Sequence, residues 1–363
     1  MPRRLTDVKS KRTLRSPAAP LSASRIIESS GVVDLHFHGA FGIDIMRADS
    51  SELDELSRLL GNNGIAAFCP TTLTVSSDKL KGALDRIGAW ISNKKPDTAS
   101  AVPLGIHLEG PFISARAAGA HPPSSIRPFS MGELLEFWEA SRRKLKILTV
   151  AADEFPKAEL NKLTQWALKN GVTLSLGHTQ ASETEAHRVF EQGITHVTHA
   201  WNALRFHHRD PGVLGAAMGR PDVFLELILD QIHVSPALMR WTCALHGINR
   251  VCFVSDCAPA AGTRNKEVSF GPLSIHLDEG AARLPDGSLA GGGTLLGHAF
   301  ENWINAETRR SGESAQALLK KYLPALTSAP LKSLNLPTSL SSRHKLRWKC
   351  TSKRIELLGR SPR

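Results

Sequence analysis

The chain has 363 residues, enough for one large domain with a small addition or for two ordinary domains. Hydrophobic residues make up 41% of it, and no apolar run approaches the ~20 residues of a membrane span, which excludes a membrane-spanning protein. The net charge of +11 is confined to the ends: residues 1–25 carry +6, residues 332–363 carry +8, and the remainder carries −3. Because the body of the chain is not basic, we expect no nucleic-acid partner.

The beginning of the chain predicts little regular structure. Residues 1–30 are basic and without period over most of their length, so we expect them to be disordered or a remnant of a β-sandwich. They hold no apolar secretory segment. The five cysteines have no framework spacing and fit a reducing compartment. Together these features predict a cytoplasmic protein that does not bind membranes.

From residue 31 onward, short apolar runs alternate with helical patterns. Eight strands are predicted at 32–39, 66–73, 102–110, 146–153, 173–178, 195–199, 223–230 and 251–256. Helices are predicted at 51–60, 77–91, 131–141, 159–169, 182–192 and 236–246, where apolar residues recur at i, i+3 or i+4. This alternation predicts an α/β fold, a (β/α)₈ barrel over 31–327. A doubly wound sheet is the alternative, but no glycine-rich phosphate loop follows the first strand.

After the barrel strands, residues 271–296 predict further strands, an Asp-Gly turn and a closing glycine-rich loop, and 314–322 predicts a last helix. Beyond residue 328 no period is found, and we predict no structure for the basic tail 328–363.

Polar side chains stand at the ends of the predicted strands, which meet on one face of a parallel barrel. The six residues are His36, His38, Glu109, His178, His199 and Asp256. Glu109, His178 and His199 suit a divalent ion, most of all Zn²⁺, with one open position for water. His36 and His38 lie two residues apart and face the same side, so a second metal is possible. Asp256 is placed to take a proton from water and return it to a leaving group.

Other polar residues are interpreted as structural. His107 lies one layer below Glu109, and His196 is predicted to face away from the metal. His207 and His208 fit a solvated loop at least as well as a phosphate contact, and Cys257 fits a small packing residue.

Several motifs, in order along residues 31 to 325, resemble the N-acetylglucosamine-6-phosphate deacetylase family of the amidohydrolase superfamily. They are the HxH of residues 36–38, HLEGPF (107–112), GAH (119–121), LGHT (176–179), THAWNAL (198–204), HHRDPG (207–212), DQIHV (230–234), VSDCAPAAG (254–262) and LAGGG (289–293). The resemblance implies metal-dependent hydrolysis of N-acetylglucosamine 6-phosphate to glucosamine 6-phosphate and acetate. It assigns the metal to Glu109, His178 and His199, with Fe, Co or Mn as alternatives to Zn, and the general acid/base to Asp256.

The resemblance also implies substrate contacts and a homodimer. The residues that match sugar and acetamido contacts are Ala120, His121, Asn202, Ala203, His233, Leu289, Ala290 and Gly291. His121 is also expected to stabilise the oxyanion. Arg209 matches a phosphate-binding arginine that serves a site at the dimer interface.

Two departures from the family accompany these matches. The small β-sandwich domain of the family is predicted to be truncated or absent at both ends, and a shifted reading frame would account for the tail 328–363. Two other functions are kept as alternatives. One is an amidohydrolase acting on a cyclic amide, which often uses a lysine after the fourth strand that 146–153 lacks at its end. The other is a catalytically degenerate protein that only binds phosphosugars.

Overall fold

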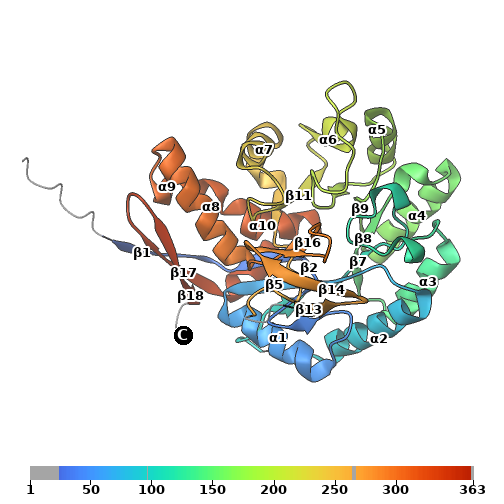
Figure 1. The fold of residues 1–363 in the computed structure, drawn as a ribbon, viewed down its shortest axis with the longest axis horizontal. Helices are drawn as coiled ribbons and strands as arrows, with labels where there is room; N and C mark the ends of the chain where they lie inside the picture. The colour runs from blue at the N-terminus through green and yellow to red at the C-terminus, as the bar shows by residue number, and fades with distance from the viewer. Residues whose placement is uncertain (1–23, 96, 264–266, 361–363) are drawn as a thin grey trace, which may run out of the picture.

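Eight parallel strands form a nearly closed barrel in the computed structural model, which describes residues 24–95, 97–263 and 267–360 (Figure 1). They are β2 (Val32–Phe37), β5 (Ile65–Thr72), β7 (Ile106–Glu109), β8 (Leu145–Val150), β9 (Thr173–Leu176), β10 (His196–Val197), β11 (Phe224–Ile228) and β12 (Val251–Val254). Each coincides with a predicted strand, and β6 (Val102–Pro103) pairs with β5. The barrel closes between β2 and β12, where the Asp256 amide donates to the His36 carbonyl at 3.0 Å. The predicted (β/α)₈ architecture is confirmed.

Helices surround the barrel (Figure 1). They are α1 (Ser50–Asn62), α2 (Ser77–Asn93), α3 (Met131–Ala140), α4 (Lys157–Asn170), α5 (Glu183–Glu191), α6 (Gly212–Ala217), α7 (Pro236–Thr242) and α8 (Leu296–Ser311). α1 illustrates the sequence pattern that predicts these helices. Leu53, Leu56 and Leu60 form its buried face, and Asp49 and Glu52 form a capping box at its start. All six predicted helices are present. None of the helices in the described ranges combines the length and apolarity that a membrane crossing needs.

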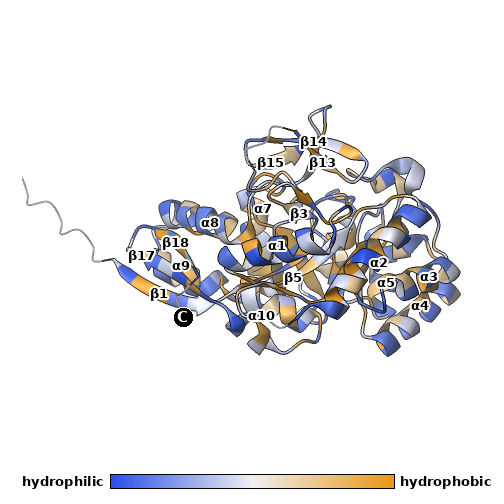
Figure 2. Ribbon diagram, turned by 90° about the horizontal axis from the view of Figure 1, so that it is seen from below, coloured by the Kyte–Doolittle hydropathy of each residue, from blue (hydrophilic) through white to orange (hydrophobic). Residues whose placement is uncertain are grey.

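Additional elements cover the two ends of the barrel. A four-stranded antiparallel sheet, β13 (Glu267–Phe270), β14 (Leu273–Asp278), β15 (Ala281–Arg283) and β16 (Leu289–Gly292), lies at the carboxyl ends of the strands. At the opposite side lies α10 (Pro324–Ser333), which follows α9 (Ala315–Tyr322) (Figure 2). Ala329 and Leu331 pack with the barrel residues Val33, Leu35 and Ile147. α10 therefore covers the base of the barrel.

The two ends of the described chain pair in a three-stranded antiparallel sheet. β17 (Lys345–Cys350) lies between β1 (Arg25–Ser30) and β18 (Ile355–Arg360), with Arg25 opposite Cys350. The prediction of no structure beyond residue 328 is therefore wrong. In β17 buried Leu346, Trp348 and Cys350 alternate with more exposed, basic residues. In the sequence the basic residues obscure this alternation, and the partner strand is more than 300 residues away. Of residues 1–30, which were predicted to be disordered or a remnant of a β-sandwich, Arg25–Ser30 form the strand β1, and residues 1–23 lie outside the described ranges.

Replacing Trp348 with alanine is expected to destabilise the protein by about 3–5 kcal/mol, the usual effect of removing a large aromatic side chain from a core. The Trp348 side chain is fully buried, its ring lies 5.7 Å from that of Phe300, and its Nε1 donates to Ser29 Oγ at 2.8 Å. Urea unfolding monitored by circular dichroism measures the change. Leu358→Ala, at a partly exposed position of the same sheet, is the control and should cost less than about 1 kcal/mol. Equal stability of the two variants would show that the tail does not pack as described.

Candidate active site

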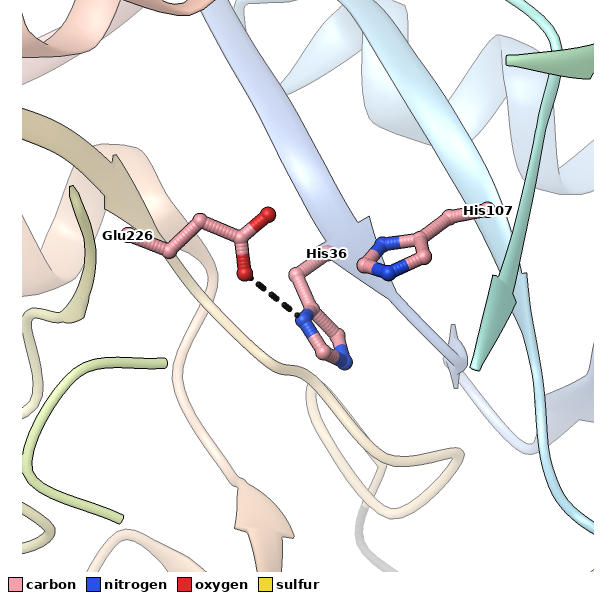
Figure 3. Close-up of side chains that lie close together, drawn as sticks. All are labelled: His36, His107 and Glu226. Carbon is pink, nitrogen blue, oxygen red and sulfur yellow. Dashed lines mark hydrogen bonds and ion pairs between the residues drawn. The ribbon is translucent and has the colours of Figure 1, made fainter. Parts of the chain in front are cut away.

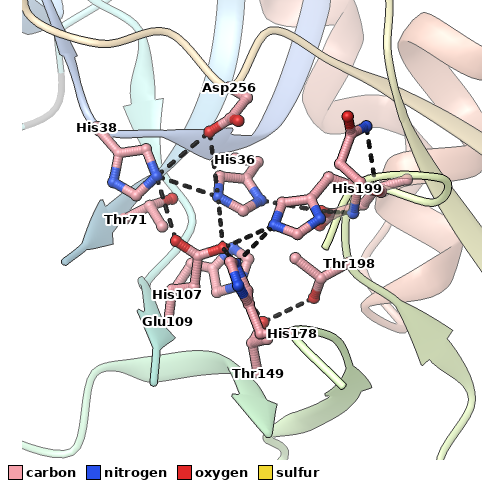
Figure 4. A network of polar contacts seen from close by, with 12 residues as sticks. His36, His38, Thr71, His107, Glu109, Thr149, His178, Thr198, His199 and Asp256 are labelled. Carbon is pink, nitrogen blue, oxygen red and sulfur yellow. Dashed lines mark hydrogen bonds and ion pairs between the residues drawn. The ribbon is translucent and has the colours of Figure 1, made fainter. Parts of the chain in front are cut away.

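Five strand ends bring six polar side chains to the mouth of the barrel. The residues are His36, His38, Glu109, His178, His199 and Asp256, each at most 9% exposed. His36 lies within β2, Glu109 ends β7, and Asp256 follows β12. Figure 4 shows these side chains converging on one point between the strands. The structure thus brings the six predicted residues together at one end of the barrel (Figure 4).

The Glu109 carboxylate is the centre of this cluster. Five imidazole Nε2 atoms lie 3.1–3.3 Å from its two oxygens, those of His36, His178 and His199 at Oε1 and those of His38 and His121 at Oε2. Burial alone would raise the pKa of Glu109, but the neighbouring His36 and His121 hold it well below its usual range. The carboxylate is therefore ionised and offers its lone pairs to the space between the rings.

The protons on the histidines decide what can bind there. His178 Nδ1 donates to the Ala117 carbonyl at 2.8 Å, which leaves the lone pair of its Nε2 facing inward. That atom is 2.9 Å from His199 Nε2, and both face Glu109 Oε1. A carboxylate oxygen and two ring nitrogens that converge in this way fit a divalent cation such as Zn²⁺.

The HxH pair extends the cluster towards Asp256. His36 Nε2 and His38 Nε2 lie 3.2 Å apart, and both approach Asp256 Oδ1, at 3.4 and 3.3 Å. Burial alone would lower the pKa of His36. Three carboxylates around it, those of Glu109, Asp256 and Glu226, instead raise that pKa well above its ordinary value. The concentration of negative charge here is what a cation would neutralise, so a second ion also fits the residues.

The backbone is held in unusual conformations where these side chains leave the strands. His178, His199 and Asp256 have φ angles of +47°, +28° and +50°, in the left-handed region that side-chain-bearing residues rarely adopt. Such strain clusters at functional sites and costs roughly 1–3 kcal/mol for each residue. It also corrects the interpretation of His196, which was expected to face away. Because the chain leaves the strand before His199, both His196 and His199 face the barrel interior, and His196 Nδ1 lies 3.1 Å from Ser175 Oγ.

A cavity of about 200 Å³ opens above the cluster. Every predicted sugar-contact residue lines it, namely Ala120, His121, Asn202, Ala203, His233, Leu289, Ala290 and Gly291. Three apolar residues in its wall were missed from the sequence, Leu73, Ile228 and Phe270. The Phe270 ring lies 5.2 Å from that of His38. No sequence signal distinguished these side chains from ordinary core residues.

Two histidines in the cavity are oriented by their neighbours. The Thr74 amide donates to His121 Nδ1 at 3.1 Å, so the remaining proton sits on Nε2 and points to Glu109. Burial lowers the pKa of His121 to about 4, which keeps its ring neutral. His233 Nδ1 donates to Asp230 at 2.6 Å. Burial would lower the pKa of His233, but Asp230 outweighs it and the pKa is raised.

Arg209 is not among the cavity residues. Its side chain is exposed on the loop between β10 and α6, which also carries His207 and His208, whose rings lie 4.1 Å apart and are tilted by 42°. No hydrogen bond or ion pair holds its guanidinium within the ranges that the structure describes, although its backbone amide donates to His207 Nδ1 at 3.3 Å. The arginine that the resemblance matches to phosphate binding therefore lies outside this cavity.

The residues interpreted as structural behave accordingly. His107 uses both ring nitrogens inside the barrel, Nδ1 at 3.0 Å from the Leu35 carbonyl and Nε2 at 2.7 Å from Thr149 Oγ1. Burial lowers its pKa to about 3, so it is neutral. Cys257 is buried, and burial raises the pKa of its thiol well above the usual value, which suits packing rather than reactivity.

Glu226 was missed. It is a completely buried acid in β11, beneath the cluster, and its Oε2 accepts from His36 Nδ1 at 3.0 Å (Figure 3). Burial would raise its pKa, but the charge and hydrogen bond of His36 lower it to about 2. The signal was present in the sequence, because a single glutamate inside an apolar strand must find a partner.

Comparison with known proteins supports one relationship. The chain is 35% identical over 263 residues to N-acetylglucosamine-6-phosphate deacetylase of Bacillus subtilis, and the match covers 72% of this chain and 65% of that protein. It is 33% identical over 276 residues to the enzyme of the same name from Lysinibacillus sphaericus, covering 75% and 69%. The chain thus spans only about two thirds of the length of these relatives. A scan against models of known protein families gives no match.

Solved structures agree with the sequence relatives. The structure of N-acetylglucosamine-6-phosphate deacetylase from Thermotoga maritima superposes with a TM-score of 0.75 at 28% identity, covering 93% of this chain and 90% of that one. A Mycobacterium smegmatis deacetylase mutant in complex with N-acetyl-D-glucosamine-6-phosphate has the same fold, with a TM-score of 0.79 at 24% identity and coverage of 94% and 90%. The chain shares its fold with these structures, and its match to the Lysinibacillus sphaericus enzyme covers more than two thirds of that enzyme. The chain therefore belongs to the N-acetylglucosamine-6-phosphate deacetylase family.

Proposed function

We propose that this protein hydrolyses the acetamido group of N-acetylglucosamine 6-phosphate, giving glucosamine 6-phosphate and acetate. One observation carries the proposal: Glu109, His178 and His199 converge within 3.3 Å of one another beside the Asp256 carboxylate, at the floor of a cavity of about 200 Å³. A cation site and a proton-transfer group next to a small polar cavity are the parts that hydrolysis of an amide requires.

The cofactor is a divalent metal ion, held by Glu109, His178 and His199, with His36 and His38 available to a second ion. Zn²⁺ suits this mixture of imidazole and carboxylate best, and Fe, Co or Mn would find acceptable ligands. When bound, such an ion acidifies a water molecule and polarises a carbonyl oxygen.

Asp256 is the general acid/base. Burial alone would raise its pKa, but His36 and His38 hold it well below the usual range, so the carboxylate is ready to accept a proton. It takes a proton from the attacking water and then gives that proton to the departing amine nitrogen, which leaves as glucosamine 6-phosphate. His121, a neutral donor at the cavity wall, stabilises the developing oxyanion.

The remaining cavity residues hold the sugar. Asn202 and Ala203 contact it from the loop after His199, Ala120 and His121 contact the acetamido side, and His233 binds a sugar hydroxyl. Leu289, Ala290 and Gly291 close the cavity from above. Galactosamine is the nearest alternative sugar, because a relative at 29% identity is named N-acetylgalactosamine-6-phosphate deacetylase.

We further propose a cytoplasmic homodimer in which Arg209 of the partner subunit binds the phosphate. An exposed apolar surface near the Arg209 loop supports this, formed by Phe206, Trp241 and Leu245, which are 54%, 61% and 67% exposed. Trp201 joins the two parts, since its ring lies 5.1 Å from Phe206 and its Nε1 donates to Thr242 at 2.9 Å. Reduced, buried cysteines suit the cytoplasm.

Replacing Arg209 with alanine is expected to lower kcat/KM for N-acetylglucosamine 6-phosphate by about 10- to 200-fold, because a charge-assisted contact to phosphate contributes about 1.5–3 kcal/mol. Turnover of unphosphorylated N-acetylglucosamine should hardly change. Arg116→Ala, which removes another exposed arginine, is the control. An equal fall in kcat/KM for both sugars would show that Arg209 does not bind the phosphate.

Product analysis separates the proposed function from its alternatives. Acetate and free amine are measured after incubation with the 6-phosphates of N-acetylglucosamine and N-acetylgalactosamine, and ring opening is measured with a cyclic amide. The proposal predicts acetate release, fastest from the glucosamine compound. Ring opening alone would establish the cyclic amidohydrolase, and tight binding of the phosphosugar without turnover would establish the degenerate protein.

A further inference from the structure

Glu226 is a charged side chain with no exposure to solvent, in the middle of the apolar strand β11. Removing a carboxylate from water costs several kcal/mol even after the protein relaxes around it. The barrel interior could be filled by an apolar side chain at this position. The charge therefore needs an explanation in what it contacts.

One oxygen of Glu226 makes two contacts with separate parts of the cluster. Its Oε2 accepts from His36 Nδ1 at 3.0 Å and from the backbone amide of His199 at 3.2 Å. The first bond fixes the proton of His36 on Nδ1 and turns Nε2 towards Glu109, 3.2 Å away. The second holds the backbone of His199 where its φ is +28°. Figure 3 shows Glu226 and His36 facing each other from different strands.

The topology explains why a single residue can do this. β11 lies between β10, which His199 follows, and β12, whose other neighbour in the barrel is β2 with His36. A side chain pointing inward from β11 can thus reach both His199, on the loop after the adjacent strand, and His36, across the barrel interior. The other oxygen, Oε1, lies 3.9 Å from His196 Nδ1 and has no hydrogen-bond partner among the described residues.

A metal ion held directly by Glu226 is a poorer explanation. His36, His107 and Glu226 do lie close enough together to form a three-ligand group. Both ring nitrogens of His107, however, are already used by the Leu35 carbonyl and Thr149. The contact between Glu226 and His36 is therefore a hydrogen bond that supports a ligand from behind.

We propose that Glu226 is a positioning residue that orients His36 and His199 for metal binding through a single carboxylate oxygen. The inference rests on the proposed metal-dependent function. Carboxylates that accept the outer N–H of a ligating histidine raise its basicity and fix its tautomer, and losing them commonly costs 10- to 100-fold in metal affinity.

Glu226→Gln and Glu226→Leu test this. Glutamine keeps an oxygen for the two N–H groups but loses the charge, whereas leucine of similar size loses both. Titration of the metal-free proteins with Zn²⁺ in competition with a chromophoric chelator should show affinity falling about 10-fold for the glutamine variant and about 100-fold for the leucine variant. Ser175→Ala is the matched control: it removes a buried hydroxyl that bonds His196 and Thr198 but touches neither His36 nor His199, and its affinity should equal that of the wild type.

Thermal unfolding of the same metal-free proteins separates positioning from general stability. The proposal predicts that Glu226→Gln retains a melting temperature close to the wild type while its Zn²⁺ affinity falls. Unchanged affinity, or a loss that merely follows a lower melting temperature, would overturn it. If the wild type itself binds no Zn²⁺, the proposed metal-dependent function fails. If the wild type and Glu226→Gln bind Zn²⁺ equally well, only the role of Glu226 fails.

Discussion

Replacing Asp256 with asparagine is expected to lower kcat for N-acetylglucosamine 6-phosphate by about 10²–10⁴-fold, the range that a positioned acid/base contributes. The amide is nearly the same size as the carboxylate, so the cavity keeps its shape, but it cannot take a proton from water. Metal content should stay at the wild-type level, because Glu109, His178 and His199 keep their contacts with one another.

The measurement is steady-state acetate release together with metal analysis of the same sample. Asp286→Asn is the matched control, since Asp286 lies in an exposed turn before β16, where its side chain caps Ser288. That variant should turn over like the wild type. Activity within a few-fold of the wild type in Asp256→Asn would show that another group moves the proton.

Replacing Glu109 with glutamine should abolish both metal binding and turnover. Five imidazoles face this one carboxylate, and the amide would lose its charge and replace one oxygen by an N–H group that cannot bind a cation. A bound ion contributes several kcal/mol to lowering the barrier. At 1.36 kcal/mol for each tenfold, its loss should reduce kcat by about 10³-fold or more.

Metal content measured by mass spectrometry and acetate release give the two readouts for this variant. Glu136→Gln, which removes an exposed carboxylate paired with Lys81 at 3.0 Å, is the control and should bind metal normally. Stoichiometric metal in Glu109→Gln would show that the ion binds elsewhere in the barrel. Full activity of this variant without metal would show that the metal ion takes no part in the reaction.

Much of the barrel was predictable from the pattern of apolar residues. They form continuous runs in strands that are buried on both faces, and they recur every three to four residues in the helices. The shared location of the polar side chains at the strand ends was also predictable, because the carboxyl ends of eight parallel barrel strands must meet on one face. The family resemblance then identified the loops that line the cavity. All the residues that it matched to sugar and acetamido contacts lie in the cavity wall. Their individual roles stay predictions, as do the boundaries of the domains.

What could not be predicted depends on contacts between distant parts of the chain. β17 looks like an unpatterned basic segment until β1 is placed beside it. The direction of His199 follows from a positive φ that no strand alternation anticipates. The isolated glutamate in β11 is visible in the sequence, but its partner, His36 Nδ1, comes from a strand 190 residues away, and Arg209 lies outside the cavity.

Acetate release from N-acetylglucosamine 6-phosphate, measured before and after chelation, tests whether the acetyl group is removed in a metal-dependent reaction. We expect purified protein to carry one or two divalent ions, a chelator to abolish acetate release while the protein stays folded, and Zn²⁺ to restore it. Undiminished acetate release by metal-free protein, or none by folded protein with its metal bound, would show that the protein is not a metal-dependent deacetylase.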